Sequence, residues 1–210
     1  MTSRSTQQNA KVDDTQIHNA KASTRERILD AALNIFSRKG YFETKMDEIV
    51  SEAKVSKGSI YVHFPNKEKL FVSLVDQFAD LIERRVNEAI RGKKGIARVK
   101  LAIETVLAAF AQYRQPAKIL LVQAVGLGNI FEKKRLEVHE RFAKTIAEVL
   151  NEAIDLGDIA PVDTFITAHA WMGAIYTVVI QWVYSGEPSK EAIAEHLVPL
   201  LLRSVGYEEK

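Results

Sequence analysis

The chain has 210 residues, and its composition already excludes several classes of protein. With 47% hydrophobic residues it can bury a sizeable core, and its 29 basic and 27 acidic residues nearly balance. It is therefore not a polybasic protein that attracts acidic partners over its whole surface. Cysteine is absent, which excludes disulfide frameworks, thiolate metal sites and cysteine nucleophiles, and which is compatible with a reducing cytosol.

The first 22 residues are polar, and Val12 and Ile17 are their only sizeable aliphatic side chains. They lack the apolar stretch of a signal peptide. A segment of this composition cannot bury enough apolar surface to fold by itself. We therefore expect a disordered N-terminal arm and a cytoplasmic protein.

A short helix is predicted from Met46 to Ala53, because four apolar residues recur there at i, i+3, i+4 and i+7. Thr44 and Asp47 have the spacing of a capping box at its start. Together these features predict a short amphipathic helix that packs one face on a core.

A second short helix follows after a turn at residues 54–55. The Ser56 hydroxyl can accept a hydrogen bond from the Ser59 amide and so begin this helix. Only Ile60 and Phe64, one turn apart, are expected to point inward, and the opposite face is polar and basic. An amphipathic helix, a turn and a short polar helix are the layout of a helix-turn-helix that reads DNA.

Two runs of sequence now resemble the DNA-binding domain of TetR-family transcriptional regulators. Residues 57–70 read KGSIYVHFPNKEKL, and residues 27–41 read RILDAALNIFSRKGY. The resemblance spans Thr24 to about Leu74. One departure concerns the turn, where members of the family commonly have glycine and this chain has Lys54. If the turn needs a left-handed residue, Lys54 costs on the order of 1 kcal/mol there.

The motif and the resemblance together imply which residues contact double-stranded DNA. Lys57 and Lys67 lie near helix starts and are assigned to phosphate, whereas Gly58 and Ser59 let the helix approach base edges. The alternative is that the basic residues simply form a solvated face. The predicted DNA contacts are Thr44, Lys45, Lys54, Ser56, Lys57, Gly58, Ser59, Tyr61, His63 and Lys67.

The rest of the chain is predicted to be helical, which makes the fold all-α. Helices are expected at 66–91, 96–113, from Pro116 onward, and at 130–156, with breaks at 92–95 and at 126–128. No strand precedes the Gly-x-Gly of 126–128, so a helix break is favoured over a nucleotide loop. The expected domains are an arm at 1–22, solvated or inserted into a DNA groove, a DNA-binding domain at 23–70, and an effector-binding and dimerisation domain at 71–210.

The segment from Phe165 to Tyr184 is almost continuously apolar and about as long as a membrane span. His169 and Gln181 interrupt it and basic flanks are missing, so we expect no membrane but a helix buried in a homodimer. With the final helix, 190–205, kinked at Pro199, it resembles the two helices that form the family's four-helix dimer interface. The predicted interface residues are Ala170, Trp171, Gly173, Ala174, Val178, Trp182, Leu197 and Leu201.

The resemblance further implies an effector pocket among the middle helices. Its candidate residues combine apolar bulk with a few polar groups, although each by itself can be ordinary core: Phe110, Tyr113, Gln123, Phe131, His139, Phe142, His169 and Tyr176. They predict a mostly apolar ligand with one or two polar handles, such as a lipophilic drug or an acyl thioester. No cofactor is expected, and no metal site either, because helical His and Glu ligand pairs at i, i+3 or i, i+4 are missing.

The sequence contains no nucleophile elbow, P-loop or zinc-protease helix, so no enzyme is predicted. The favoured reading is a ligand-responsive repressor that binds a palindromic operator as a homodimer and releases it when a small molecule binds. The alternative is a helical interaction module that has lost sequence-specific DNA binding.

Overall fold

The computed structural model describes residues 23–123 and 128–207, apart from the side chains of residues 122 and 123, and contains no strand in these ranges. The predicted arm at 1–22 lies outside them. In chain order the elements are α2 (Thr24–Glu43), α3 (Met46–Ala53), α4 (Lys57–His63), α5 (Lys67–Ala89), α6 (Ala97–Gln112), α7 (Arg114–Ala117), the π-helical η1 (Lys118–Gln123), α8 (Asn129–Asp155), α9 (Thr164–Ser185) and α10 (Lys190–Ser204). The predicted all-α fold is confirmed, and η1 is an element that the sequence did not predict.

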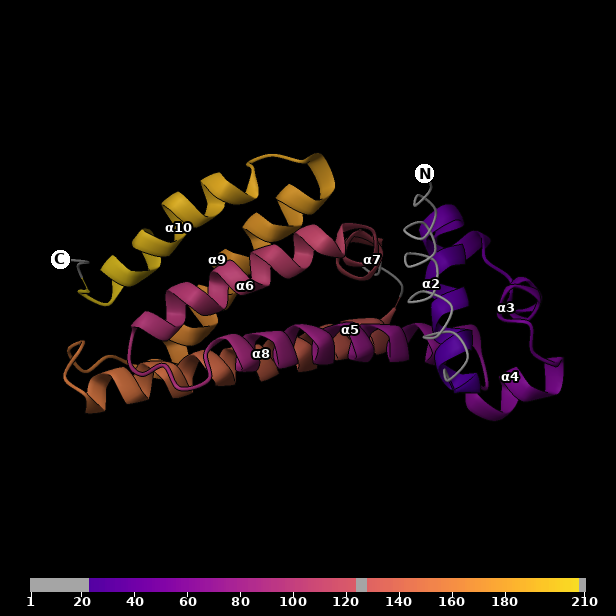
Figure 1. Cartoon of the computed structure of the whole chain (residues 1–210), viewed down its shortest axis with the longest axis horizontal. Helices are drawn as coiled ribbons and strands as arrows, with labels where there is room; N and C mark the ends of the chain where they lie inside the picture. The colour runs from indigo at the N-terminus through magenta and orange to yellow at the C-terminus, as the bar shows by residue number, and fades with distance from the viewer. Residues whose placement is uncertain (1–22, 124–127, 208–210) are drawn as a thin grey trace, which may run out of the picture.

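Figure 1 shows α2, α3 and α4 at one end of an elongated molecule, with the long helices α5 and α8 running away from them. The small end has its own core, in which Phe36, Ile49 and Ile60 are fully buried against Phe71 from the start of α5. Because α5 is continuous from this core into the larger bundle, it joins the two parts of the molecule rigidly. The boundary at residues 70–71 stays a prediction.

The helix α3 begins at Met46, as predicted, but its cap differs from the prediction. The Glu48 carboxylate accepts a hydrogen bond from the Lys45 amide at 3.0 Å, so Lys45 is the N-cap. The Thr44 hydroxyl donates instead to the Gly40 carbonyl at 2.7 Å. The expected Thr44–Asp47 capping box is therefore wrong, because the last turn of α2 takes up the threonine hydroxyl.

The turn between α3 and α4 has the geometry that the sequence suggested. Lys54 is left-handed, with φ 52° and ψ 48°, and is the only non-glycine residue of the described chain with a positive φ. Ser56 then begins α4, its hydroxyl accepting from the Ser59 amide at 3.1 Å. The turn places α4 across the end of the small domain, with Ile60 and Phe64 buried beneath it.

The larger bundle is formed by α5, α6, α8, α9 and α10 (Figure 1). Its main core gathers buried aliphatic side chains of α6 and α8 around Trp171 and Trp182 of α9 and Leu197 and Leu201 of α10. By length and composition α9 could cross a membrane, and it is the only such helix in the described ranges. Its two tryptophans, Trp171 and Trp182, are buried in the core of the bundle.

Candidate functional site

The exposed face of α4 is the candidate DNA-binding surface. Tyr61 and Val62 are 42% and 83% exposed, and His63 is exposed beside them. A Cβ added at Gly58 would meet no atom within 4 Å, so the protein itself leaves this side of the helix open. The helix therefore presents small and polar groups and Val62 outward, while Ile60 and Phe64 face the core, which is the layout of a recognition helix.

Lys57 lies at the start of α4 on this surface. Its ammonium group is 2.8 Å from an Asp47 carboxylate oxygen, and that hydrogen bond raises the pKa of Lys57. An exposed ion pair of this kind contributes little to stability, so DNA phosphate can replace the carboxylate at small cost. Lys45 and Lys54 are exposed on the same domain, which leaves their assignment to DNA open as a prediction.

Lys67 has structural partners that the sequence analysis did not anticipate. Its ammonium donates to the carbonyl oxygens of Tyr41, Phe42 and Thr44 at 2.7, 3.1 and 2.8 Å. It also lies 4.5 Å from the centre of the Tyr41 ring, and burial lowers its pKa. An ammonium has three protons, and all are used on these carbonyls. In this structure Lys67 therefore holds the end of α2 against α5, in place of the phosphate contact expected for it.

Thr44 is the predicted DNA contact that the structure contradicts. It is 1% exposed and its hydroxyl is bonded to Gly40, so DNA cannot reach it in this conformation. Ser56 uses its hydroxyl as a helix cap, and Ser59 is half-buried. Both remain near the surface through their backbone amides at the start of α4.

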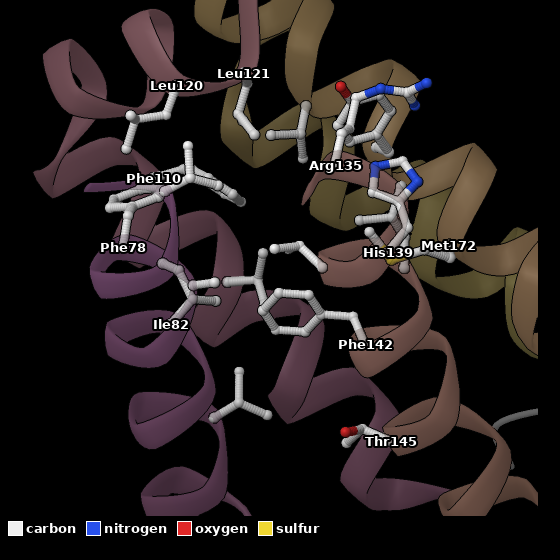
Figure 2. Close-up of a pocket in the computed structure, with 18 of the residues that line it drawn as sticks. Phe78, Ile82, Phe110, Leu120, Leu121, Arg135, His139, Phe142, Thr145 and Met172 are labelled. Carbon is white, nitrogen blue, oxygen red and sulfur yellow. The ribbon is translucent and has the colours of Figure 1, made fainter. Parts of the chain in front are cut away.

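A cavity of about 160 Å³ lies in the larger bundle, between α5, α6, α8 and α9 (Figure 2). Five of the predicted pocket residues line it: Phe110, Phe131, His139, Phe142 and Tyr176. Tyr113 and His169 do not line it, and the side chain of Gln123 lies outside the described residues. Tyr113 is turned outward, where its hydroxyl accepts from Arg85 at 2.9 Å. His169 is exposed and pairs with Glu140 at 3.1 Å.

The lining is apolar except for Thr145, whose hydroxyl donates to the Arg141 carbonyl at 3.3 Å, and for a group of polar side chains at the opposite end. Figure 2 shows Arg135 and His139 together at that end, across the cavity from Phe78 and Ile82. Arg135 was missed from the sequence, although it lies one helical turn after Phe131 and one before His139. This i, i+4, i+8 spacing places Phe131, Arg135 and His139 on one face of α8, and it could have identified Arg135 from the sequence.

Phe131 connects the cavity to the DNA-binding domain. Its ring, which lines the cavity, contacts the rings of Tyr41 and Phe71 edge-to-face at 5.5 and 5.4 Å between centroids. Tyr41 and Phe71 in turn contact each other and Phe36. We call these four rings the aromatic cluster. It joins α2, α5 and α8, so a shift of the cavity wall at Phe131 reaches the base of the helix-turn-helix through packed side chains.

The outward face of α9 is the candidate dimer surface, but its residues differ from those predicted. Trp171, Trp182, Leu197 and Leu201 are buried within the single chain, so these four predictions are wrong. Ala174 and Val178 are half-buried against the same core, whereas Ala170 and Gly173 are exposed. The exposed large apolar residues near them are Phe165, Ile166, Tyr184 and, on α10, Leu200.

The described residues contain no group of three histidine, aspartate or glutamate side chains that could hold a metal ion. The site residues found are thus of two kinds: those of a polar surface on α4 and those of a mostly apolar cavity in the larger bundle. Neither contains an arrangement of nucleophile, base and orienting group that acyl- or phosphoryl-transfer chemistry requires.

Comparison with known proteins gives matches over both parts of the chain. Residues 28–74 match the family described as bacterial regulatory proteins, tetR family, and residues 92–205 match the tetracyclin repressor-like C-terminal domain. The HTH-type transcriptional regulator SrpR of Pseudomonas putida is 24% identical over 172 residues, 82% of this chain and 79% of its own length.

Solved structures share the fold. The transcriptional regulator FadR of Bacillus subtilis, in complex with stearoyl-CoA, superposes with a TM-score of 0.74 at 22% identity, over 87% of this chain and 98% of its own. AibR, in complex with isovaleryl coenzyme A and operator DNA, superposes with a TM-score of 0.63 at 22% identity, over 85% of this chain and 97% of its own. The arrangement of α2 to α10 is therefore one that recurs among regulators.

Proposed function

This chain belongs to the TetR family of bacterial transcriptional regulators and is not an enzyme, and we propose that it is a homodimeric repressor that releases its operator when a mostly apolar small molecule binds. Two copies related by a two-fold axis present two α4 helices, which implies a palindromic operator with half-sites about one helical turn of DNA apart. A regulator of this kind acts in the cytoplasm, where its DNA lies.

The observation that carries the proposal is the double contact of Phe131. The ring lines the cavity on one side and packs on Tyr41 and Phe71 of the DNA-binding end on the other. A ligand controls DNA binding only if it favours one of two arrangements of the domain. A ligand that fills the cavity must displace or fix Phe131, and the aromatic cluster then changes with it.

The effector is proposed to be mostly apolar because the cavity wall is. Aliphatic and aromatic side chains of α5, α6, α8 and α9 make up nearly all of it. The stearoyl-CoA and isovaleryl-CoA complexes of FadR and AibR support an acyl thioester as one candidate for this chain. Lipophilic drugs are the other candidate, because they offer the same kind of surface.

The homodimer is proposed from the outward face of α9 and α10. Phe165, Ile166, Tyr184 and Leu200 are each more than half exposed, and Gly173 between them lets a second backbone approach closely. Large apolar side chains left exposed along two helices favour an interaction site there. A second copy supplies the same surface and closes the assembly.

In vitro transcription tests the proposal. Genomic DNA fragments are first enriched with the purified protein, and the enriched palindrome is placed over a promoter. We expect the protein to lower transcription and a cavity ligand to restore it. The variant Phe131→Leu should still bind DNA and ligand while the ligand releases DNA less, since the cluster is loosened. If the protein raises transcription, it is not a repressor. If the ligand relieves repression equally well in wild-type protein and in Phe131→Leu, the aromatic cluster does not carry the signal.

A further inference from the structure

The polar end of the cavity contains two buried groups without hydrogen bonds. The Nε2 atom of His139 and the hydroxyl of Tyr176 are both inaccessible to solvent, and neither makes a hydrogen bond of good geometry in the described part of the chain, although the Arg135 guanidinium lies beside the tyrosine hydroxyl and acts to lower its pKa. Their rings lie edge-to-face with centroids 4.2 Å apart, and both line the cavity. Buried polar atoms are nearly always hydrogen-bonded in native proteins. Two such atoms at one end of an apolar cavity therefore mark the place where a ligand supplies the partner, once a small movement of the neighbouring side chains lets its oxygen reach them.

The charges around this end are already balanced within the protein. The guanidinium of Arg135 donates twice to one Glu132 carboxylate oxygen, at 2.7 and 3.0 Å. Burial, and then the charge of Arg135, lowers the pKa of His139, while burial raises the pKa of Tyr176. Both rings are thus neutral at pH 7. A buried anion here would find no cation that lacks a counterion, and would lose its hydration.

We propose that the effector carries one uncharged oxygen, a carbonyl or a hydroxyl, that hydrogen-bonds to Tyr176 and His139, and that it is not a free carboxylate. The tyrosine hydroxyl donates to this oxygen, and His139 donates or accepts according to its tautomer. The inference rests on the proposed function only in taking the cavity as the effector site. The carbonyl of a ketone, an ester or a thioester meets the requirement equally.

The volume of the cavity limits the size of the apolar part of the ligand. An engineered cavity of about 150 Å³ in another protein holds one benzene molecule, and the cavity here measures about 160 Å³. One ring with a short substituent, or a short branched chain, therefore fits this conformation. A longer chain requires the helices around the cavity to move apart.

Calorimetric titration of the full-length protein without DNA tests the assignment, using three probes of similar shape. Acetophenone has a neutral carbonyl, benzoate a carboxylate, and ethylbenzene no polar atom. We expect acetophenone to bind at least about tenfold more tightly than benzoate at pH 7.5, since only the anion must shed a charge's hydration. Benzoate binding as tightly as acetophenone, or no binding of acetophenone at millimolar concentration, overturns the proposal.

A matched pair of tyrosine variants locates the contact. Tyr176→Phe should lose about fivefold in affinity for acetophenone and none for ethylbenzene, because it removes one hydrogen bond. Tyr113→Phe, whose hydroxyl faces Arg85 outside the cavity, should change neither. Equal losses for both ligands in Tyr176→Phe would show a packing effect and overturn the contact. The three-probe comparison on wild-type protein decides the proposal even if a variant does not fold.

These titrations contain no DNA, so their failure is distinct from failure of the proposed function. If a carboxylate or another compound binds and releases the operator, the repressor stands and only the neutral polar end is wrong. If no operator exists but acetophenone binds as expected, the proposed function is wrong and the site assignment stands.

Discussion

The two lysines assigned to phosphate from the sequence should behave oppositely when replaced by methionine. Lys67 donates three hydrogen bonds to carbonyls at the end of α2, whereas Lys57 has one exposed carboxylate partner. A hydrogen bond to a charged group contributes about 1.5–3 kcal/mol when buried. The three carbonyls near Lys67 can regain some water when it is removed, so the losses do not add. We expect Lys67→Met to destabilise by about 2 kcal/mol, which for a chain of this length lowers Tm by about 4–8 °C.

Lys57→Met is the matched control for that measurement. Its side chain is 64% exposed, and its loss should change the unfolding free energy by less than about 0.5 kcal/mol. Thermal unfolding followed by circular dichroism compares the two variants with wild-type protein. The same proteins are then titrated with duplex DNA at several salt concentrations, followed by fluorescence anisotropy.

In the DNA titrations Lys57→Met should have the larger effect, whereas in thermal unfolding Lys67→Met has it. Lys57→Met should reduce the slope of log K against log salt by about 1 per subunit, or about 2 for the dimer on its operator, because each subunit loses one phosphate contact. Lys67→Met should weaken binding, if at all, without changing that slope. A Lys67→Met protein that is as stable as wild type and has a smaller slope would refute the reasoning and return Lys67 to the phosphate role.

Three further predictions concern the turn, the dimer and one histidine. Lys54→Gly should raise the free energy of unfolding, measured with urea, by about 0.5–1 kcal/mol. Removing the strain of a left-handed lysine is expected to outweigh the extra conformational entropy of glycine in the unfolded chain. A lower free energy of unfolding would mean that contacts of the lysine side chain matter more than its backbone strain. Light scattering should detect monomers or aggregates for Ile166→Glu. It should detect the dimer for the control Leu136→Glu, because Leu136 is exposed on another helix. A dimer that Ile166→Glu leaves unchanged would rule out the α9 surface as the interface. The Phe165 carbonyl, and to a smaller extent Glu140, raise the pKa of His169. Any stability that protonated His169 gains from these two partners is therefore present below about pH 6.5 and is lost as the pH rises through the raised pKa. Glu140→Gln should lower that pKa in an NMR titration, and an unchanged value would leave the backbone carbonyl as the cause.

Most features governed by local sequence were predicted, with the Thr44–Asp47 capping box as the exception. The start of α4 at Ser56 and the left-handed Lys54 depend on atoms within a few residues of each other, and the spacing of apolar residues gave the helix boundaries. Lys67 was misassigned because its carbonyl partners lie at the end of α2, and this contact exists only after α2 and α5 have packed. Thr44 was misassigned although its partner is local, because its hydroxyl donates to the Gly40 carbonyl four residues earlier and is not free to cap α3.

The inner and outer faces of α9 could not be separated from the sequence, because this helix is apolar on all sides. Residue size does not separate the faces either: Trp171, Trp182 and the small Ala168 lie in the core, whereas the small Ala170 and Gly173 and the large Ile166 lie outside. In the cavity, aromatic bulk correctly indicated Phe131 and Phe142. Polarity alone was a poor guide, since it selected His169 at the surface and passed over Arg135 at the cavity.

Selection of genomic DNA fragments by the purified full-length protein, followed by sequencing, tests the central claim most directly. Wild-type protein and Tyr61→Ala are compared, because Tyr61 is exposed on α4 and its replacement leaves the buried core intact. The account predicts that wild-type protein enriches a palindrome with two half-sites about one turn of DNA apart, and that Tyr61→Ala enriches it less or not at all. Recovery of fragments without a common sequence by the wild-type protein would contradict the account and favour a helical interaction module.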